Sequence, residues 1–173
     1  MSKTIDDFRN FFRTDKEKQS FSLLNAVHET IALQEAQFKN HAIDVEIEGE
    51  DISLFSLKGE FQQTILNLIN NAKDALVESG RCDKKITIQL LGDALAVEDN
   101  AGGIPEEILE RIFEPYFTTK EQGNGTGIGL YMSKLIIEKN MGGILSVENR
   151  SEGARFLIQF HPQSILKELQ IIA

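Results

Sequence analysis

The sequence predicts an α/β two-layer sandwich in which a mixed, largely antiparallel sheet of about five strands carries helices on one face. Three observations lead to this prediction. Apolar and polar residues alternate in several short segments, as is typical of half-buried strands. Turn residues such as Gly92-Asp93 separate two of these segments and indicate an antiparallel hairpin. Longer segments, at 59–79 and at about 127–140, repeat their apolar residues at helical spacing instead.

The elements follow in chain order from the same patterns. We expect an amphipathic helix at 4–13, a helix from Ser20 to Phe38, strands at 43–47 and 52–57, a helix at 59–79, strands at 86–90 and 94–98, a short helix opened by Ile104-Pro105, a loop at 113–126, a helix at about 127–140, a hairpin of 144–148 and 154–160, and a short final helix capped by Ser164. The loop is long enough to indicate a function of its own.

The composition is that of an ordinary soluble globular domain. The 173 residues suit one domain with a helical appendage, and 41% of them are hydrophobic. The formal net charge of −9 argues against a nucleic-acid partner, because such a partner needs a basic face. No apolar run approaches the roughly 18 residues that span a bilayer, so we expect no membrane contact from this chain. The lone Cys82 fits a reducing compartment such as the cytoplasm.

The segment 66–76, LNLINNAKDAL, places asparagines inside an expected helix, where short amides are poor helix formers. At 100° per residue, Asn67, Asn71 and Asp74 fall within about 60° of one another. Asn70 lies at the edge of the same arc, and the apolar residues occupy the opposite side. Side-chain oxygens of this kind suit a hard cation such as Mg²⁺. A chance polar face is the alternative.

Two glycine-rich segments have the chemistry of a ligand site. In 97–104, VEDNAGGI, Asp99 ends a buried strand, and it can accept a hydrogen bond from an exocyclic amine such as that of adenine. In 123–130, GNGTGIGL, glycines lead into a helix whose N-terminus favours an anion. This segment lacks the lysine and hydroxyl of a P-loop and the preceding strand of a dinucleotide fingerprint. A strand-end turn and a flexible linker are the respective alternatives.

These segments occur in an order that resembles a known family. The motifs are Asn67-x-x-x-Asn71-Ala72, Asp99-x-Ala101-x-Gly103, the run IFEPYFTTK from Ile112 to Lys120, Gly125-Thr126-Gly127-Ile128-Gly129-Leu130, and Gly153-Ala154-Arg155-Phe156. Together they closely resemble the catalytic, ATP-binding domain of sensor histidine kinases, in the superfamily that includes gyrase, heat-shock chaperone and mismatch-repair ATPases. The resemblance covers about residues 20–162 and implies the Bergerat ATP-binding fold, with ATP and Mg²⁺ as cofactors.

The resemblance implies roles for individual residues. Asn71 would hold the Mg²⁺ that bridges the phosphates, Asn67 would lie beside it, and Lys120 would neutralise phosphate charge. Asp99 would bond the adenine amine. The other residues expected at the nucleotide are Asp74, Gly103, Ile104, Gly125, Thr126, Gly127, Ile128, Gly129, Leu130 and Phe156. Phe156 would pack beneath the adenine pocket or serve as a core aromatic, and Phe113 to Asn124 would form a mobile lid.

Three positions depart from the family pattern or narrow its chemistry. The ATPase relatives carry a glutamate where Asn67 stands, and that glutamate is the general base that activates water. An asparagine cannot act as a base, and Glu60, about two turns earlier, is no obvious replacement, so the resemblance implies phosphoryl transfer rather than hydrolysis. Ala101 replaces a glycine, so its φ is expected below zero. Asp74 stands where many members carry lysine.

The chain shows no acceptor histidine of the kind that such a kinase needs. The expected pattern is His-Glu-x-x-x-Pro on a dimerisation helix, and no proline follows His28-Glu29. His41 and His161 are interpreted as structural. We therefore interpret residues 1–19 as the remnant of a dimerisation helix and linker. Residues 20–173 would be the ATP-binding domain of a longer, homodimeric kinase, whether or not that kinase is membrane-anchored.

Four functions are compatible with the sequence. The first is transfer of the ATP γ-phosphoryl group to a histidine, for relay to a response regulator. The alternatives are a same-fold serine kinase of the anti-sigma type, a non-catalytic nucleotide-binding module and an ATPase of the topoisomerase class. The complete Asn, Asp and Gly sets argue against the module, and Asn67 argues against the ATPase. We expect the isolated chain to bind ATP and to hydrolyse it slowly.

Overall fold

A five-stranded sheet forms one layer of the protein, which we describe from a computed structural model for residues 9, 17–121 and 125–167. Its strands, in spatial order, are β2 (Asp44–Glu48), β4 (Lys85–Leu90), β5 (Ala94–Asp99), β7 (Ala154–Gln159) and β6 (Ile144–Asn149). Strands β2 and β4 are parallel, and every other neighbouring pair is antiparallel. The mixed, largely antiparallel sheet is therefore confirmed.

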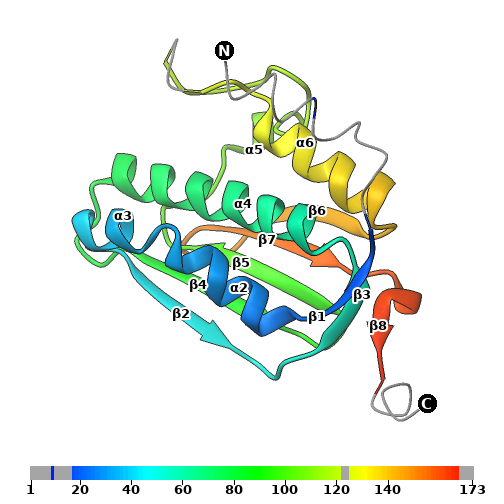
Figure 1. Ribbon diagram of the computed structural model, residues 1–173. Coiled ribbons are helices and arrows are strands. Elements are labelled where there is room, and N and C mark those ends of the chain that lie inside the picture. Colours follow the sequence, from blue (N-terminus) through cyan, green and yellow to red (C-terminus); the bar gives the residue numbers. More distant parts are fainter. Residues whose placement is uncertain (1–8, 10–16, 122–124, 168–173) are drawn as a thin grey trace.

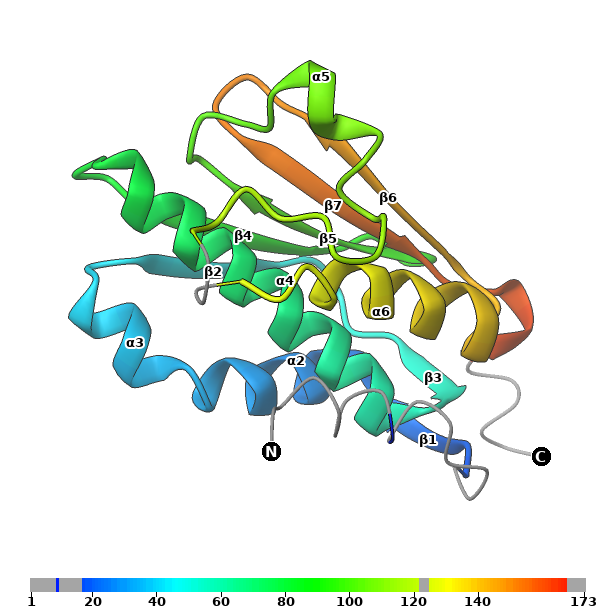
Figure 2. The same cartoon turned by 90° about the horizontal axis from the view of Figure 1, so that it is seen from above.

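Helices form the second layer, on one face of this sheet (Figures 1 and 2). They are α2 (Leu23–Ala32), α3 (Glu35–Asn40), α4 (Lys58–Ser79) and α6 (Gly129–Leu135), which continues into the π-helical turn η1 (Ile136–Asn140). A short helix, α5 (Glu106–Leu109), follows β5. Helix α4 lies between α2 and α6 and is the longest helix among the described residues (Figure 2). Gly80 caps its C-terminal end, with a φ of +67°, a left-handed conformation that glycine adopts without strain.

The core lies between the two layers and fixes which side of α4 faces outward. Strand β4 alternates, and its Ile86, Ile88 and Leu90 are buried. The side of α4 that faces the core carries Phe61, Ile65, Leu68, Ile69, Ala72 and Leu76, all of them buried. Because a helix has 3.6 residues per turn, burial of this stripe leaves the asparagine side of α4 turned away from the core.

A second, small sheet corrects two predictions. Its strands are β1 (Gln19–Ser22), β3 (Ser53–Ser56) and β8 (Ile165–Leu166), in the order β1-β3-β8. The helix expected from Ser20 is wrong at its start, because Ser22 is the N-cap of α2 and its hydroxyl accepts a hydrogen bond from Asn25 N at 3.1 Å. The final helix expected at Ser164 is also wrong. A single 3₁₀ turn, η2 (Pro162–Ser164), leads instead into β8, which pairs with β3.

Other predicted boundaries differ less. The second predicted helix is interrupted between α2 and α3, at Leu33 and Gln34. The helix expected at about 127–140 begins at Gly129 and widens into a π-helix for its last turn. Apart from Arg9, the helix predicted at 4–13 lies outside the described residues, as does most of the segment 1–19. No helix in the described part of the chain is both long and apolar enough to cross a membrane.

Candidate functional site

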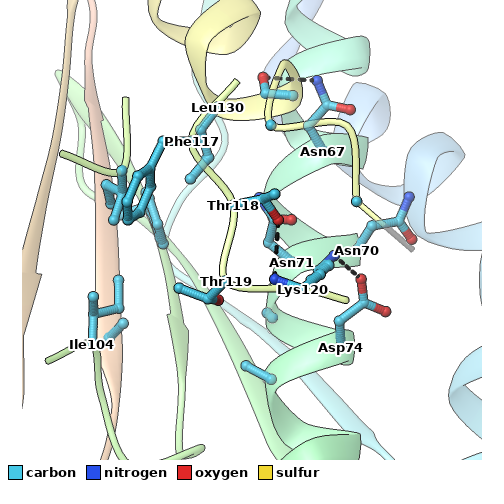
Figure 3. Close-up of a pocket in the computed structure, with 18 of the residues that line it drawn as sticks. Asn67, Asn70, Asn71, Asp74, Ile104, Phe117, Thr118, Thr119, Lys120 and Leu130 are labelled. Carbon is cyan, nitrogen blue, oxygen red and sulfur yellow. Dashed lines mark hydrogen bonds and ion pairs between the residues drawn. The ribbon is translucent and has the colours of Figure 1, made fainter. Parts of the chain in front are cut away.

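A cavity of 610 Å³ lies between the outward side of α4, the loop after β5 and the segment that leads into α6 (Figure 3). All the residues that the sequence placed at a nucleotide line it. They are Asn67, Asn71, Asp74, Asp99, Gly103, Ile104, Lys120, Gly125, Thr126, Gly127, Ile128, Gly129, Leu130 and Phe156. Segments up to 89 positions apart therefore converge on one site.

One wall of the cavity is the polar side of α4. Asn67, Asn70, Asn71 and Asp74 lie along this side, and Ile104 and Phe117 lie across the cavity from them (Figure 3). The wall is longer than the sequence analysis expected, because Gln63 and Glu78 also line it. The signal was present: Gln63 is four positions before Asn67, and Glu78 is four positions after Asp74, so both continue the same helical face.

Asn67 joins α4 to the start of α6. Its amide Nδ2 donates to Ser133 Oγ at 3.2 Å and to the Gly129 carbonyl at 3.4 Å. Ser133 is fully buried, and its hydroxyl also donates to the Gly129 carbonyl, at 2.9 Å. The amide therefore holds the first turn of α6, where the glycine segment ends, against the asparagine side of α4.

The lid segment carries a positive charge to the same wall. Lys120 Nζ forms an ion pair and hydrogen bond with Asp74 Oδ2 (Figure 3). Lys73 Nζ lies 3.5 Å from the other oxygen of Asp74. A lysine on the lid thus meets an aspartate on the helix. A cation is therefore placed at the cavity even though position 74 itself carries an acid.

The first part of the lid touches the glycine segment that follows the lid, through the backbones of the two segments. Tyr116 N donates to the Gly127 carbonyl at 2.8 Å. Gly127 has a φ of +68°, and a Cβ there would overlap the Tyr116 carbonyl carbon and stand 2.7 Å from the Tyr116 Cα. Tyr116 itself has a φ of +65°, which is rare for a bulky residue, and it is 74% exposed. The residues between 121 and 125 lie outside the described part of the lid.

Asp99 is the buried carboxylate of the site, with 8% of its surface exposed. Its Oδ1 accepts from Ala101 N at 2.9 Å and from Ala154 N at 3.5 Å. Burial raises the pKa of the Asp99 carboxyl above its ordinary value, and these two backbone N–H groups offset part of that rise. Gly153 makes the arrangement possible, because a Cβ there would overlap the Asp99 carbonyl oxygen and stand 2.7 Å from Oδ1.

The loop after Asp99 takes its unusual conformation at glycines. Gly102 has a φ of +103° and Gly103 a φ of +88°. Ala101 is not among the residues of positive φ, as expected from its side chain. Phe156, on β7, lines the cavity and also belongs to the core, where its ring meets that of Phe113 edge-on at 6.3 Å. Phe156 is therefore a core aromatic that also lines the cavity, and its contact with adenine stays a prediction.

Sequence reasoning missed part of the apolar wall of the cavity. Pro105, Ile108 and Ile112 line it next to the expected Ile104, and Phe117, Thr118 and Thr119 line it from the segment that was expected to form the lid. Their helical spacing from 105 to 112 was a usable signal.

The cavity also shows which metal ligands are available: among the described residues there is no cluster of three or more His, Cys, Asp or Glu side chains. A cation here would need oxygens from a ligand and from water as well as from the amides.

Comparisons with known proteins agree with this geometry. Residues 57–164 match the family described as histidine kinase-, DNA gyrase B- and HSP90-like ATPase. The chain is 38% identical over 130 residues to the two-component sensor PprA of Pseudomonas aeruginosa, an alignment that covers 70% of this chain. The solved catalytic domain of histidine kinase ThkA superposes with a TM-score of 0.71 at 34% identity, over 83% of this chain and 95% of that one.

A further solved structure contains ThkA in complex with the response regulator protein TrrA. It matches with a TM-score of 0.69 at 29% identity, over 91% of this chain and 46% of that one. The chain spans only 14%, 24% and 13% of the lengths of three curated relatives that it matches.

Proposed function

Because the chain belongs to the family of histidine kinase-, DNA gyrase B- and HSP90-like ATPases, as a catalytic domain of the sensor histidine kinase type, we propose that it transfers the ATP γ-phosphoryl group to a histidine of its full-length protein. The observation that carries the proposal is the single cavity in which the α4 asparagines, Asp99 and the glycine turn before α6 come together. These groups would supply the Mg²⁺ ligand, the contact to the adenine base and the contacts to the phosphates of a nucleotide.

The nucleotide would lie across the cavity with its base at Asp99 and its phosphates at α6. Asp99 Oδ1 is engaged by two backbone N–H groups, so Oδ2 is the oxygen that would accept from the adenine amine. Gly127 and Gly129 lead into α6, which runs on through η1, and the dipole of this helix favours the phosphate charge. Lys120 would turn from Asp74 to the phosphate oxygens or contact both.

The residues present fit Mg²⁺ bound together with ATP. Mg²⁺ prefers oxygen ligands and keeps several waters, so it is usually held by few protein groups and by substrate phosphates. Asn71 lines the cavity beside Asn67, and the described residues contain no all-protein metal cage. Asn71 would supply one oxygen, and the ion would neutralise phosphate charge during transfer.

Phosphoryl transfer fits the site better than hydrolysis. Asn67 has no basic group, and its amide nitrogen is committed to Ser133 and Gly129. Glu60 is 8% exposed, accepts from Asn140 Nδ2 at 3.0 Å and does not line the cavity. The two carboxylates that do line this face of α4, Asp74 and Glu78, lie about two and about three turns further along the helix than Asn67. No carboxylate is therefore placed as Asn67 is, and a water there would lack its general base.

The proposed acceptor, partner and location follow from the sensor-kinase relatives. The acceptor histidine would lie on a dimerisation helix of a homodimer. The phosphoryl group would then pass to a response regulator, as the complex of ThkA with TrrA supports. The domain would act in the cytoplasm, with no nucleic-acid or membrane contact of its own.

The test is a chimera in which the dimerisation helices of the PprA sensor precede residue 17 of this chain. We expect label from [γ-³²P]ATP to enter the chimera only with Mg²⁺, and the bond to be acid-labile and alkali-stable, as phosphohistidine is. The Asn71→Ala variant should lose this labelling. An acid-stable, alkali-labile product would contradict the proposal and favour the serine-kinase alternative.

Lys120 offers a separate prediction about the phosphate end. The Lys120→Ala variant should bind ATP about tenfold more weakly, because it loses a charged contact to the outer phosphates. Its affinity for AMP should change less than about twofold, since AMP lacks those phosphates. Lys73→Ala is the matched control, because Lys73 also lies beside Asp74 but does not line the cavity. Calorimetric titration with both nucleotides measures the effect, and equal losses for ATP and AMP would contradict the assignment.

A further inference from the structure

The loop that walls the base end of the cavity is held from outside the cavity. This loop follows Asp99, and its Gly102 and Gly103 both have positive φ. Glycine is the residue with the most backbone freedom, so two successive glycines do not by themselves fix the conformation of the loop. Ile104 comes next and projects toward the cavity opposite α4 (Figure 3). Its position decides the shape of the wall.

The hairpin of β6 and β7 holds the loop, together with the aspartate that precedes it, at three points. Gly102 N donates to the Glu152 carbonyl at 2.8 Å, and Ala154 N donates to Asp99 at 3.5 Å. The third point is Asn149, the last residue of β6. Unlike the first two, it acts through a side chain and can therefore be removed by substitution.

Asn149 pairs with both polar groups of the Ile104 backbone. Its Oδ1 accepts from Ile104 N at 2.8 Å, and its Nδ2 donates to the Ile104 carbonyl at 2.7 Å. A primary amide is the side-chain group that offers a donor and an acceptor side by side, so it can pair with a peptide as a neighbouring strand would. The pairing also fixes the orientation of the amide, because a flipped amide would face donor to donor and acceptor to acceptor.

The same amide packs against Gly103. A Cβ at position 103 would stand 2.9 Å from Asn149 Oδ1, so only the glycine allows the amide to come this close. The Asn149 Nδ2 also lies 3.2 Å from Glu106 Oε1, at the start of α5. Asn149 itself does not line the cavity. It therefore contacts the back of the loop and has no direct contact available with a bound base.

We propose that Asn149 is a positioning residue for recognition of the base: through its paired hydrogen bonds to Ile104 it sets the wall opposite α4 and so the fit of adenine. The proposal rests on the proposed function, because it assumes that the cavity takes ATP. Loss of the amide frees the two-glycine loop, which widens the base end. The phosphate end, built by α4 and the segment before α6, is left as it is.

The experiment measures the affinities of ATP and GTP by competition against a fluorescent ATP analogue. In the wild type, the Asp99 carboxylate accepts from the adenine amine and repels the guanine oxygen, so ATP should bind more tightly. Asn149→Ala should lower the affinity for ATP about tenfold, the worth of two hydrogen bonds. It should change the affinity for GTP less than about twofold. Asn149→Asp keeps one hydrogen bond and places a carboxylate against the Ile104 carbonyl. Its preference for ATP over GTP should therefore fall about as far as that of Asn149→Ala.

The matched control is Asn140→Ala. Asn140 is also a part-buried amide that makes one long-range bond, to Glu60 at 3.0 Å, and it does not line the cavity. It should leave the ATP-to-GTP ratio unchanged. If Asn149→Ala has the same ratio of ATP affinity to GTP affinity as the wild type, this inference is overturned but the proposed function is not. A wild type that binds neither nucleotide would overturn the proposed function and, with it, this inference.

A measurement without substitution protects the test from a variant that fails to fold. In the wild-type protein, the bond to Asn149 should slow hydrogen exchange of the Ile104 amide relative to the amide of Gly103, for which the structure gives no such partner. Equal exchange rates for the two amides would contradict the paired hydrogen bonds on which the inference depends.

Discussion

Replacement of Asp99 by asparagine is expected to weaken ATP binding about 100-fold, the worth of a hydrogen bond to a charged acceptor and of the mismatch that replaces it. Asparagine keeps an oxygen for the N–H groups of Ala101 and Ala154, so the local backbone should be retained. Its amide nitrogen then stands where Oδ2 stood. A donor would face the donor of the adenine amine, and the contact that fixes the base would be lost.

The same substitution is expected to stabilise the ligand-free protein. Burial raises the pKa of the Asp99 carboxyl in the folded state. Such a group favours folding fully below its unfolded pKa of about 3.9 and loses that contribution as the pH rises through the higher folded pKa. At pH 7 the buried carboxylate therefore lowers the free energy of unfolding. Asparagine carries no charge, so the melting temperature should rise by about 2–4 °C for each kcal/mol recovered.

Calorimetry with ATP and a thermal melt without nucleotide check both effects on one variant. The matched control is Glu98→Gln, which makes the same change of charge one position earlier. Successive strand residues point to opposite faces, and Glu98 lies near Arg155 rather than in the cavity. The control should bind ATP as the wild type does. An Asp99→Asn variant with unchanged affinity would contradict the base contact, and one with a lower melting temperature would contradict the burial argument.

Replacement of Gly127 by alanine is the second substitution that we expect to have a large effect on ATP binding. Its new Cβ would overlap the carbonyl carbon of Tyr116, which is backbone and cannot move aside as a side chain can. The hydrogen bond from Tyr116 N to the Gly127 carbonyl, at 2.8 Å, would break, and the first part of the lid would separate from the glycine segment before α6. We expect ATP affinity to fall at least about tenfold while the rest of the domain stays folded.

Gly80→Ala separates this effect from simple backbone strain. Gly80 has a φ of +67° and Gly127 a φ of +68°, so alanine is strained to the same degree at both. At position 80 nothing lies within 4 Å of the new Cβ, and the position follows α4 away from the cavity. Gly80→Ala should lower the free energy of unfolding by about 1 kcal/mol, the cost of a side chain in the left-handed conformation, and leave ATP affinity unchanged. Similar affinities for the two variants would show that the lid contact does not matter for binding.

The sequence predicted those parts of the fold whose signals are local. The alternation in β4 and the Gly92-Asp93 turn are sufficient for a hairpin, and the stripe in α4 is sufficient for its buried face. The helix expected from Ser20 failed because a stripe from Leu24 to Phe38 was extended backward through Ser22, a good N-cap residue. Strand β8 has two residues and exists through its pairing with β3, so no local pattern could specify it.

The candidate site divides in the same way. Its lining residues could be predicted because motifs fix their order and helical spacing places the asparagines on one face of α4. The contacts that shape it could not. The Lys120–Asp74 ion pair joins positions 46 apart, and the Asn149–Ile104 pair joins positions 45 apart. Each depends on how the lid and the last hairpin fold over α4 and β5, which only the assembled chain determines.

The position of β7 between β5 and β6 has a consequence for synthesis of the protein. The base end needs the backbone N–H of Ala154 and the space left by Gly153, which come late in the chain, whereas Asp99 comes much earlier. Contacts between distant positions form late because the intervening chain must first be ordered. A nascent chain on the ribosome should therefore gain affinity for ATP only after its last hairpin has emerged. Nucleotide binding can therefore stabilise the completed fold, but it cannot assist the first steps of folding.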